Sequence, residues 1–136
     1  MMVVVDASVI IKIITEERGS DAAAARVMLA DERIAPDWIR LEVASGLSKK
    51  VRMAGLPIEQ ARASLSAMDF FLTELADTNA LVDRAFALSV LMEHALYDCL
   101  YLALAEARGC ILLTADAKFV AATVRNNLSR HVELLS

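Results

Sequence analysis

The sequence lacks most of the features that mark secreted or membrane proteins. It has two cysteines, Cys99 and Cys110, which are too few for a disulfide framework and are predicted to be small core residues. No apolar run reaches the roughly 20 residues that cross a bilayer. No basic segment precedes the first apolar run, as a secretion signal requires. We therefore expect no membrane segment and a location in the reducing cytoplasm.

Positive charge is also scarce. The chain has 14 Lys and Arg residues against 18 Asp and Glu residues, a formal net charge of −4. A protein that binds nucleic acid by charge alone is normally basic. A phosphate substrate must therefore meet a local basic patch or metal ions held by acidic side chains. The sequence also has no Gly-rich phosphate loop and no Cys-x-x-Cys pair.

Apolar residues are abundant by contrast. They make up 57% of the chain, above the roughly 45–50% of an ordinary soluble domain. Much of the excess is alanine, and the remainder predicts apolar surface covered by another subunit. We expect a homodimer or another tightly bound partner.

Short β-branched segments alternate with longer helical patterns, which is typical of an α/β sheet. No linker or repeat interrupts them, so residues 1–136 are predicted to form a single domain. The predicted strands are 2–5, 33–35, 70–75, 111–113 and 132–134. The predicted helices are 8–14, 21–30, 37–53, 58–68, 78–92, 97–108 and 116–123. Asp37 and Thr78 are the expected N-caps of two of them, and Gly55 and Gly109 the expected ends of two.

Two acids stand in apolar surroundings. Asp98 is the only charged residue between Glu93 and Glu106, and Asp6 is the only one in residues 1–11. An ionised carboxylate in such a setting is costly unless a cation neutralises it. Because these acids are far apart in sequence, they suggest a shared cation.

In a parallel sheet the strand C-termini and the helix N-termini share one edge. Asp6 and Asp116 follow predicted strands, Asp98 lies in the first turn of a predicted helix, and Glu42 lies in the second turn of another. All four are therefore expected at this edge. Each also has a plainer interpretation: Asp6, Asp116 and Asp98 as residues that suit a helix N-terminus, and Glu42 as part of a solvated stripe.

Carboxylate oxygens without histidine or thiol ligands favour Mg²⁺ or Mn²⁺ over zinc. We interpret His94 and His131 as ordinary surface or hydrogen-bonded histidines outside the acidic set. A receiver-like Mg²⁺-binding signalling domain is the alternative fold, but it usually has adjacent acids after the first strand, where this chain has Ala7 and Ser8. A non-catalytic interaction protein is the other alternative.

Four segments in order resemble the PIN-domain family, and within it the VapC-like toxins of toxin–antitoxin pairs. These segments are Val3–Ser8, Leu41–Ser45, Tyr97–Tyr101 and Leu113–Asp116. The resemblance implies a three-layer α/β/α fold with a parallel sheet of about five short strands. It also implies an Mg²⁺- or Mn²⁺-dependent endoribonuclease, inhibited by an antitoxin protein, that cleaves RNA phosphodiester bonds.

By the same resemblance, Asp6, Glu42, Asp98 and Asp116 match the catalytic and metal-binding acids. Ser8 and Thr114 match supporting hydroxyls, although helix capping explains both equally well. Lys49 shares a helical face with Glu42, so we hypothesise that Lys49 or Arg52 contacts RNA phosphates, against the simpler interpretation of a solvated helix surface. The aromatic residues are expected in the core or a subunit interface rather than as base-stacking platforms: Trp38, Phe70, Phe71 and Phe86.

Overall fold

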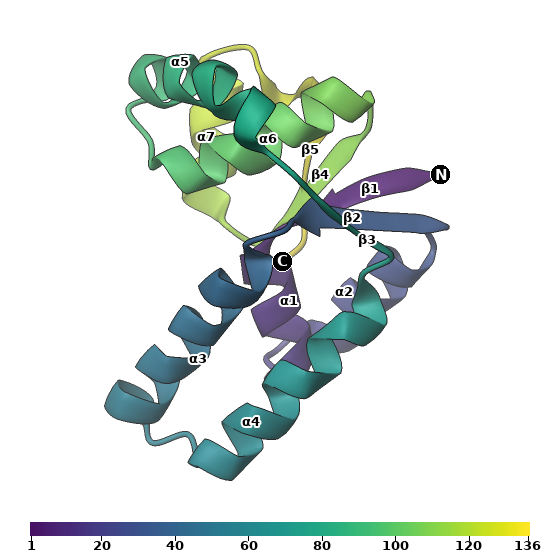
Figure 1. The fold of residues 1–136 in the computed structure, drawn as a ribbon, viewed down its shortest axis with the longest axis vertical. Helices are drawn as coiled ribbons and strands as arrows, with labels where there is room; N and C mark the ends of the chain where they lie inside the picture. Colours follow the sequence, from purple (N-terminus) through teal and green to yellow (C-terminus); the bar gives the residue numbers. More distant parts are fainter.

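The computed structural model describes all 136 residues and contains one five-stranded sheet with helices on both faces (Figure 1). The strands are β1 (Met2–Val5), β2 (Glu32–Pro36), β3 (Glu74–Ala76), β4 (Ile111–Thr114) and β5 (Val132–Leu134). Every neighbouring pair is parallel, and the order across the sheet is β3-β2-β1-β4-β5. The predicted α/β class with a parallel sheet of about five short strands is confirmed.

The helices form two layers. One face of the sheet is covered by α1 (Ala7–Ile14), α2 (Ser20–Met28), α3 (Ile39–Ala54) and α4 (Ile58–Ala67), and the other by α5 (Val82–Met92), α6 (Leu96–Arg108) and α7 (Ala117–Arg125) (Figure 1). Short 3₁₀ turns complete the chain: Met68–Phe71, Asn79–Leu81 and Ser129–His131. Helices α3 and α4 extend beyond the sheet as a pair. Gly55 and Gly109 end α3 and α6 with positive φ angles, as predicted.

The core lies around β1 and α6. Residues 3–5 of β1 have no exposed surface, because β2 and β4 flank the strand and helices cover both faces. In α6, residues 99–105 are all buried in succession. This burial explains the near-continuous apolar sequence after Asp98. It also fixes the first turn of α6, where Asp98 lies, at the C-terminal edge of the sheet.

The predicted third strand, residues 70–75, is wrong in its first half. Residues 68–71 instead continue from α4 as a 3₁₀ turn, and pairing with β2 begins only at Glu74. Thr73 explains the late start, because its hydroxyl accepts from the Arg33 N–H at 2.7 Å and donates to the Arg33 carbonyl at 3.1 Å. The Thr73 N–H also donates to the Arg33 carbonyl at 2.8 Å, so the hydroxyl takes the Arg33 N–H just before the regular ladder begins.

Both predicted N-caps are also wrong. Helix α3 begins two residues after Asp37, whose N–H bonds the Ala76 carbonyl at 2.8 Å and so extends the sheet. Thr78 is followed by a 3₁₀ turn before α5, and its hydroxyl accepts from the indole N–H of Trp38 at 3.0 Å. The Thr78 hydroxyl is thus used in a tertiary contact, and the Asp37 backbone is used to extend the sheet.

The two cysteines are free; Cys99 is buried and Cys110 is half-buried. None of the helices combines the length and the hydrophobicity that crossing a bilayer would require.

Candidate metal-binding active site

The four predicted acids meet at the C-terminal edge of the sheet. Asp6 follows β1 and caps α1, and Asp116 follows β4 and caps α7. Glu42 and Asp98 lie in the first turns of α3 and α6, so Glu42 is one turn earlier than expected. Their charges act on one another: Asp98 contributes to the raised pKa of Asp6 and of Glu42. The structure therefore brings together the acids that the sequence placed at this edge.

Asp6 is the most buried of the four, with 7% of its surface exposed. One carboxylate oxygen, Oδ1, accepts from the Ser8 hydroxyl at 2.6 Å and from the Val9 N–H at 3.1 Å. Burial raises the pKa of Asp6 to about 6 in spite of these hydrogen bonds. No basic side chain pairs with it, since the ion pairs of the chain all involve other carboxylates.

Glu42 is held by Tyr101, a contact that the sequence analysis missed. The Tyr101 hydroxyl donates to Oε1 of Glu42 at 2.8 Å, and its ring is 1% exposed. Burial raises the pKa of Glu42 and also that of Tyr101, which keeps the tyrosine protonated as a donor. The signal was present in the sequence, because Tyr101 lies three residues after Asp98 and so shares its helix face.

His94 belongs to the acidic site, which corrects its interpretation as a histidine outside it. It lies in the loop between α5 and α6, and its Nε2 is 2.8 Å from Oδ2 of Asp98. Its ring also packs against Phe119, with centroids 4.9 Å apart. Burial raises the pKa of Asp98, while the hydrogen bond from His94 opposes that rise. By contrast, Nδ1 of His131 bonds the Cys110 carbonyl at 3.0 Å, the hydrogen-bonded role that was expected.

His94, Asp98 and Asp116 each offer one ligand atom, and these atoms all lie within 4.8 Å of one another. Such a spacing fits a single divalent ion. These candidate ligand atoms are one imidazole nitrogen and two carboxylate oxygens, whereas the sequence predicted oxygen ligands alone. Carboxylates suit Mg²⁺ and Mn²⁺, while an imidazole adds affinity for transition metals. The site carboxylates also have no Lys or Arg partner, and a bound cation would neutralise the charge that their burial makes costly.

The two predicted hydroxyls lie beside the first and last acids. Oγ of Ser8 and Oγ1 of Thr114 are 3.5 Å apart. Ser8 accepts from the Ala115 N–H at 2.9 Å, and Thr114 accepts from the Asp116 N–H at 3.1 Å. They therefore tie the ends of β1 and β4 together, and the Ser8 hydroxyl also orients the Asp6 carboxylate. The Asp116 carboxylate is oriented instead by the N–H groups of Lys118 and Phe119.

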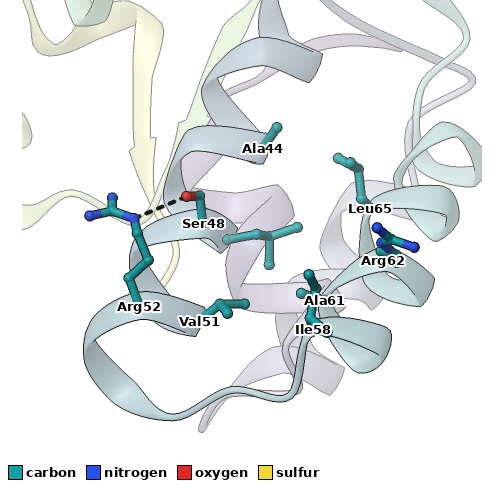
Figure 2. A pocket seen from close by; sticks show the side chains of 9 residues that line it. Ala44, Ser48, Val51, Arg52, Ile58, Ala61, Arg62 and Leu65 are labelled. Atoms are coloured by element: carbon teal, nitrogen blue, oxygen red, sulfur yellow. Dashed lines mark hydrogen bonds between the residues drawn. The ribbon is translucent and has the colours of Figure 1, made fainter.

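The two basic residues proposed to contact RNA lie farther along α3. Lys49 is exposed and has no ion-pair partner, whereas Nε of Arg52 donates to the Ser48 hydroxyl at 3.2 Å (Figure 2). Arg52 also borders a groove of about 350 Å³ between α3 and α4. The other residues lining this groove are mostly apolar, and none of the four acids is among them (Figure 2).

The aromatic residues differ in their burial. Phe71 packs partly against the core, but Phe70 and Phe86 are 69% and 62% exposed, so neither belongs to the core of this chain. Trp38 is half-buried and meets Tyr101 edge to face, with centroids 5.2 Å apart. Of Trp38 and these three phenylalanines, only Trp38 lies next to one of the four acids, Glu42.

Comparisons with known proteins agree with this geometry. The family described as PIN domain matches residues 3–124, a segment that contains all four acids. Ribonuclease VapC3 of Pyrobaculum aerophilum is 36% identical over 118 residues, which cover 85% of this chain and 90% of that protein. The crystal structure of PAE2754 from the same organism matches with a TM-score of 0.70 at 21% identity, covering 96% of both chains. That second likeness concerns the fold alone.

Proposed function

The chain belongs to the PIN-domain family as a VapC-like member, and from this premise we propose that it is a metal-dependent endoribonuclease. The carrying observation is the group of partly or fully buried carboxylates at one sheet edge with no Lys or Arg partner. A divalent cation would neutralise these carboxylates. It would also let an acidic protein approach the phosphates of RNA.

The proposed ion is Mg²⁺ or Mn²⁺, held by Asp6, Asp98 and Asp116. When bound, it supplies Lewis-acid chemistry, which activates a water molecule and neutralises charge that develops on the phosphate. The Ser8 hydroxyl holds the Asp6 carboxylate in place, and the Thr114 hydroxyl accepts from the backbone N–H of Asp116.

Glu42 and His94 complete the proposed site. Glu42, fixed by the Tyr101 hydroxyl, orients the attacking water or adds an oxygen ligand. His94 either adds a nitrogen ligand or fixes the Asp98 carboxylate by its hydrogen bond. Lys49 and Arg52 remain our proposed phosphate contacts, since α3 carries both beyond Glu42 toward solvent.

The proposed biological role is that of a toxin inhibited by an antitoxin protein. The chain exposes sixteen large apolar side chains, which supports a protein partner. Val82, Phe86 and Val90 repeat every four residues on α5 and support a homodimer through that helix. The single domain and the cytoplasmic location stay predictions, and the free cysteines fit a reducing compartment.

Family membership removes the receiver-like alternative, and an activity assay separates an enzyme from a non-catalytic PIN-fold protein. We expect the pure protein to cleave single-stranded or structured RNA with Mg²⁺ or Mn²⁺, and EDTA to stop cleavage. Asp98→Asn keeps the shape of the side chain but removes its charge, so it should lower kcat by about 100-fold or more.

Asp83→Asn is the matched control. Asp83 also lies in the first turn of a helix, α5, but it is exposed and outside the site. We expect its cleavage rate to equal that of the unmodified chain. Cleavage that resists EDTA, or full activity in Asp98→Asn, would contradict the proposed mechanism.

A further inference from the structure

A small pocket opens directly beside Glu42. Its volume is about 380 Å³, within the range of roughly 300–1,000 Å³ that is typical of small-molecule sites. Five residues line it, contributed by the segment leading into α3, by α3 itself and by the start of α6: Trp38, Leu41, Glu42, Ser45 and Tyr97.

Two aromatic rings form one corner of this pocket. The Trp38 and Tyr97 rings meet edge to face, with centroids 5.1 Å apart and an interplanar angle of 75°. Trp38 is held in place, because its indole N–H donates to the buried Thr78 hydroxyl and its ring also packs edge to face on Tyr101. Its orientation is therefore set before any ligand arrives, which lowers the entropic cost of binding.

The remaining apolar surface of the pocket faces solvent. Tyr97 is 57% exposed and Leu41 is 75% exposed, although each adjoins one of the four acids in sequence. Tyr97 precedes Asp98, and Leu41 precedes Glu42. Glu42 itself lines the pocket and is one of the four acids, so the pocket adjoins the acidic site.

We propose that this pocket accepts one unpaired nucleobase of the RNA, next to the phosphodiester bond that is cut. This inference rests on the proposed function. A base offers a flat π-face for stacking on an aromatic side chain, and its edge can bond the Ser45 hydroxyl. A phosphate would meet the Glu42 carboxylate and be repelled. A protein helix needs a longer groove than five residues provide.

The single tryptophan of the chain makes the pocket directly observable. With EDTA present, adenosine should quench Trp38 fluorescence saturably, whereas ribose should not. Neither probe carries a phosphate, so this measurement does not depend on metal or on cleavage. We expect Tyr97→Ala to weaken adenosine binding about 10-fold, and Tyr97→Phe, which keeps the ring, to retain most of it.

Phe70→Ala is the control, since Phe70 is at least as exposed as Tyr97 but lies in the 3₁₀ turn Met68–Phe71, outside the pocket. It should leave adenosine binding unchanged. In cleavage assays with Mg²⁺, Tyr97→Ala should raise KM for single-stranded RNA about 10-fold while kcat changes by less than about twofold. Phe70→Ala should change neither constant.

The possible results distinguish a failure of the base-binding proposal from a failure of the proposed nuclease function. The proposal that the pocket binds a base would be overturned, even if RNA is cleaved, by any of three results. These are no quenching by adenosine, equal quenching by ribose, and unchanged adenosine affinity in Tyr97→Ala. Adenosine binding in a chain that cleaves no RNA would support the pocket as a base site and overturn the nuclease. Loss of an antitoxin complex in Tyr97→Ala, with adenosine affinity unchanged, would identify a protein interface and overturn the proposal.

Discussion

The pKa values of acidic side chains shift in opposite directions at the two edges of the central sheet. At the N-terminal edge, Asp31 pairs with the N-terminal ammonium group at 2.8 Å and Glu74 pairs with Arg108. These partners lower the pKa of both carboxyls. At the C-terminal edge, burial raises the pKa of Asp6, Glu42 and Asp98, and no Lys or Arg compensates them.

The C-terminal edge therefore lowers the stability of the folded chain, whereas the N-terminal edge does not. Exposed ion pairs such as Glu74–Arg108 contribute about 0–1 kcal/mol and could be placed at either edge. Three partly or fully buried carboxylates without such partners lower stability, because burial removes water from a charge that nothing neutralises. Folding alone gives no reason to place them there. Sites that conflict with stability in this way are commonly functional.

Asp6 should make the free energy of unfolding strongly dependent on pH when no metal is bound. The pKa of Asp6 is about 6 in the folded protein and about 4 for an unfolded aspartate. Between these values the folded state holds a proton that the unfolded state has lost, so the free energy of unfolding falls as pH rises. Urea unfolding in EDTA should show that Asp6→Asn removes up to about 3 kcal/mol of this fall between pH 4 and 7. Asparagine keeps a side-chain oxygen to cap α1.

Glu74→Gln provides the opposite-edge control. Because the pKa of Glu74 is lowered, its contribution is present at neutral pH and is lost as pH falls through its folded pKa. The exposed pair should change stability by less than about 1 kcal/mol, with the opposite dependence on pH. Parallel pH profiles for Asp6→Asn and the unmodified chain would show that the two edges do not differ as described.

A smaller effect is expected from His94, which contacts Asp98 at the C-terminal edge. His94→Asn should weaken Mn²⁺ binding about 10-fold, or about 1.4 kcal/mol, because the imidazole is a ligand or fixes Asp98. The loss should be smaller for Mg²⁺, which has less preference for nitrogen. Mn²⁺ and Mg²⁺ titrations of His131→Asn serve as the control, since His131 bonds the Cys110 carbonyl. Equal losses in the two variants would contradict a specific role for His94.

The gathering of the four acids could be predicted because it depends on backbone topology. Asp6 and Asp116 follow strands, and Glu42 and Asp98 open helices, so a parallel sheet places all four at one edge. The apolar surroundings of Asp6 and Asp98 supplied the second signal. Neither inference needed the position of any side chain in space.

The errors occurred where a tertiary contact overrides local preference. Thr78 has the chemistry of a cap, but the indole of Trp38 takes its hydroxyl. Residues 70 and 71 have the composition of a strand but continue a helical turn. His94 was misplaced because its relation to Asp98 crosses a helix boundary, where spacing rules give little guidance. Such contacts depend on packing between elements that periodicity cannot position.

The central claim is that the C-terminal edge binds a divalent cation that the N-terminal edge does not. Calorimetric titration with Mn²⁺ tests it most directly, using the unmodified chain, Asp98→Asn and Glu74→Gln. We predict saturable binding to the unmodified chain and to Glu74→Gln, with affinity about 100-fold lower or undetectable in Asp98→Asn. Equal Mn²⁺ affinity in all three proteins, or no binding to the unmodified chain, would contradict the account.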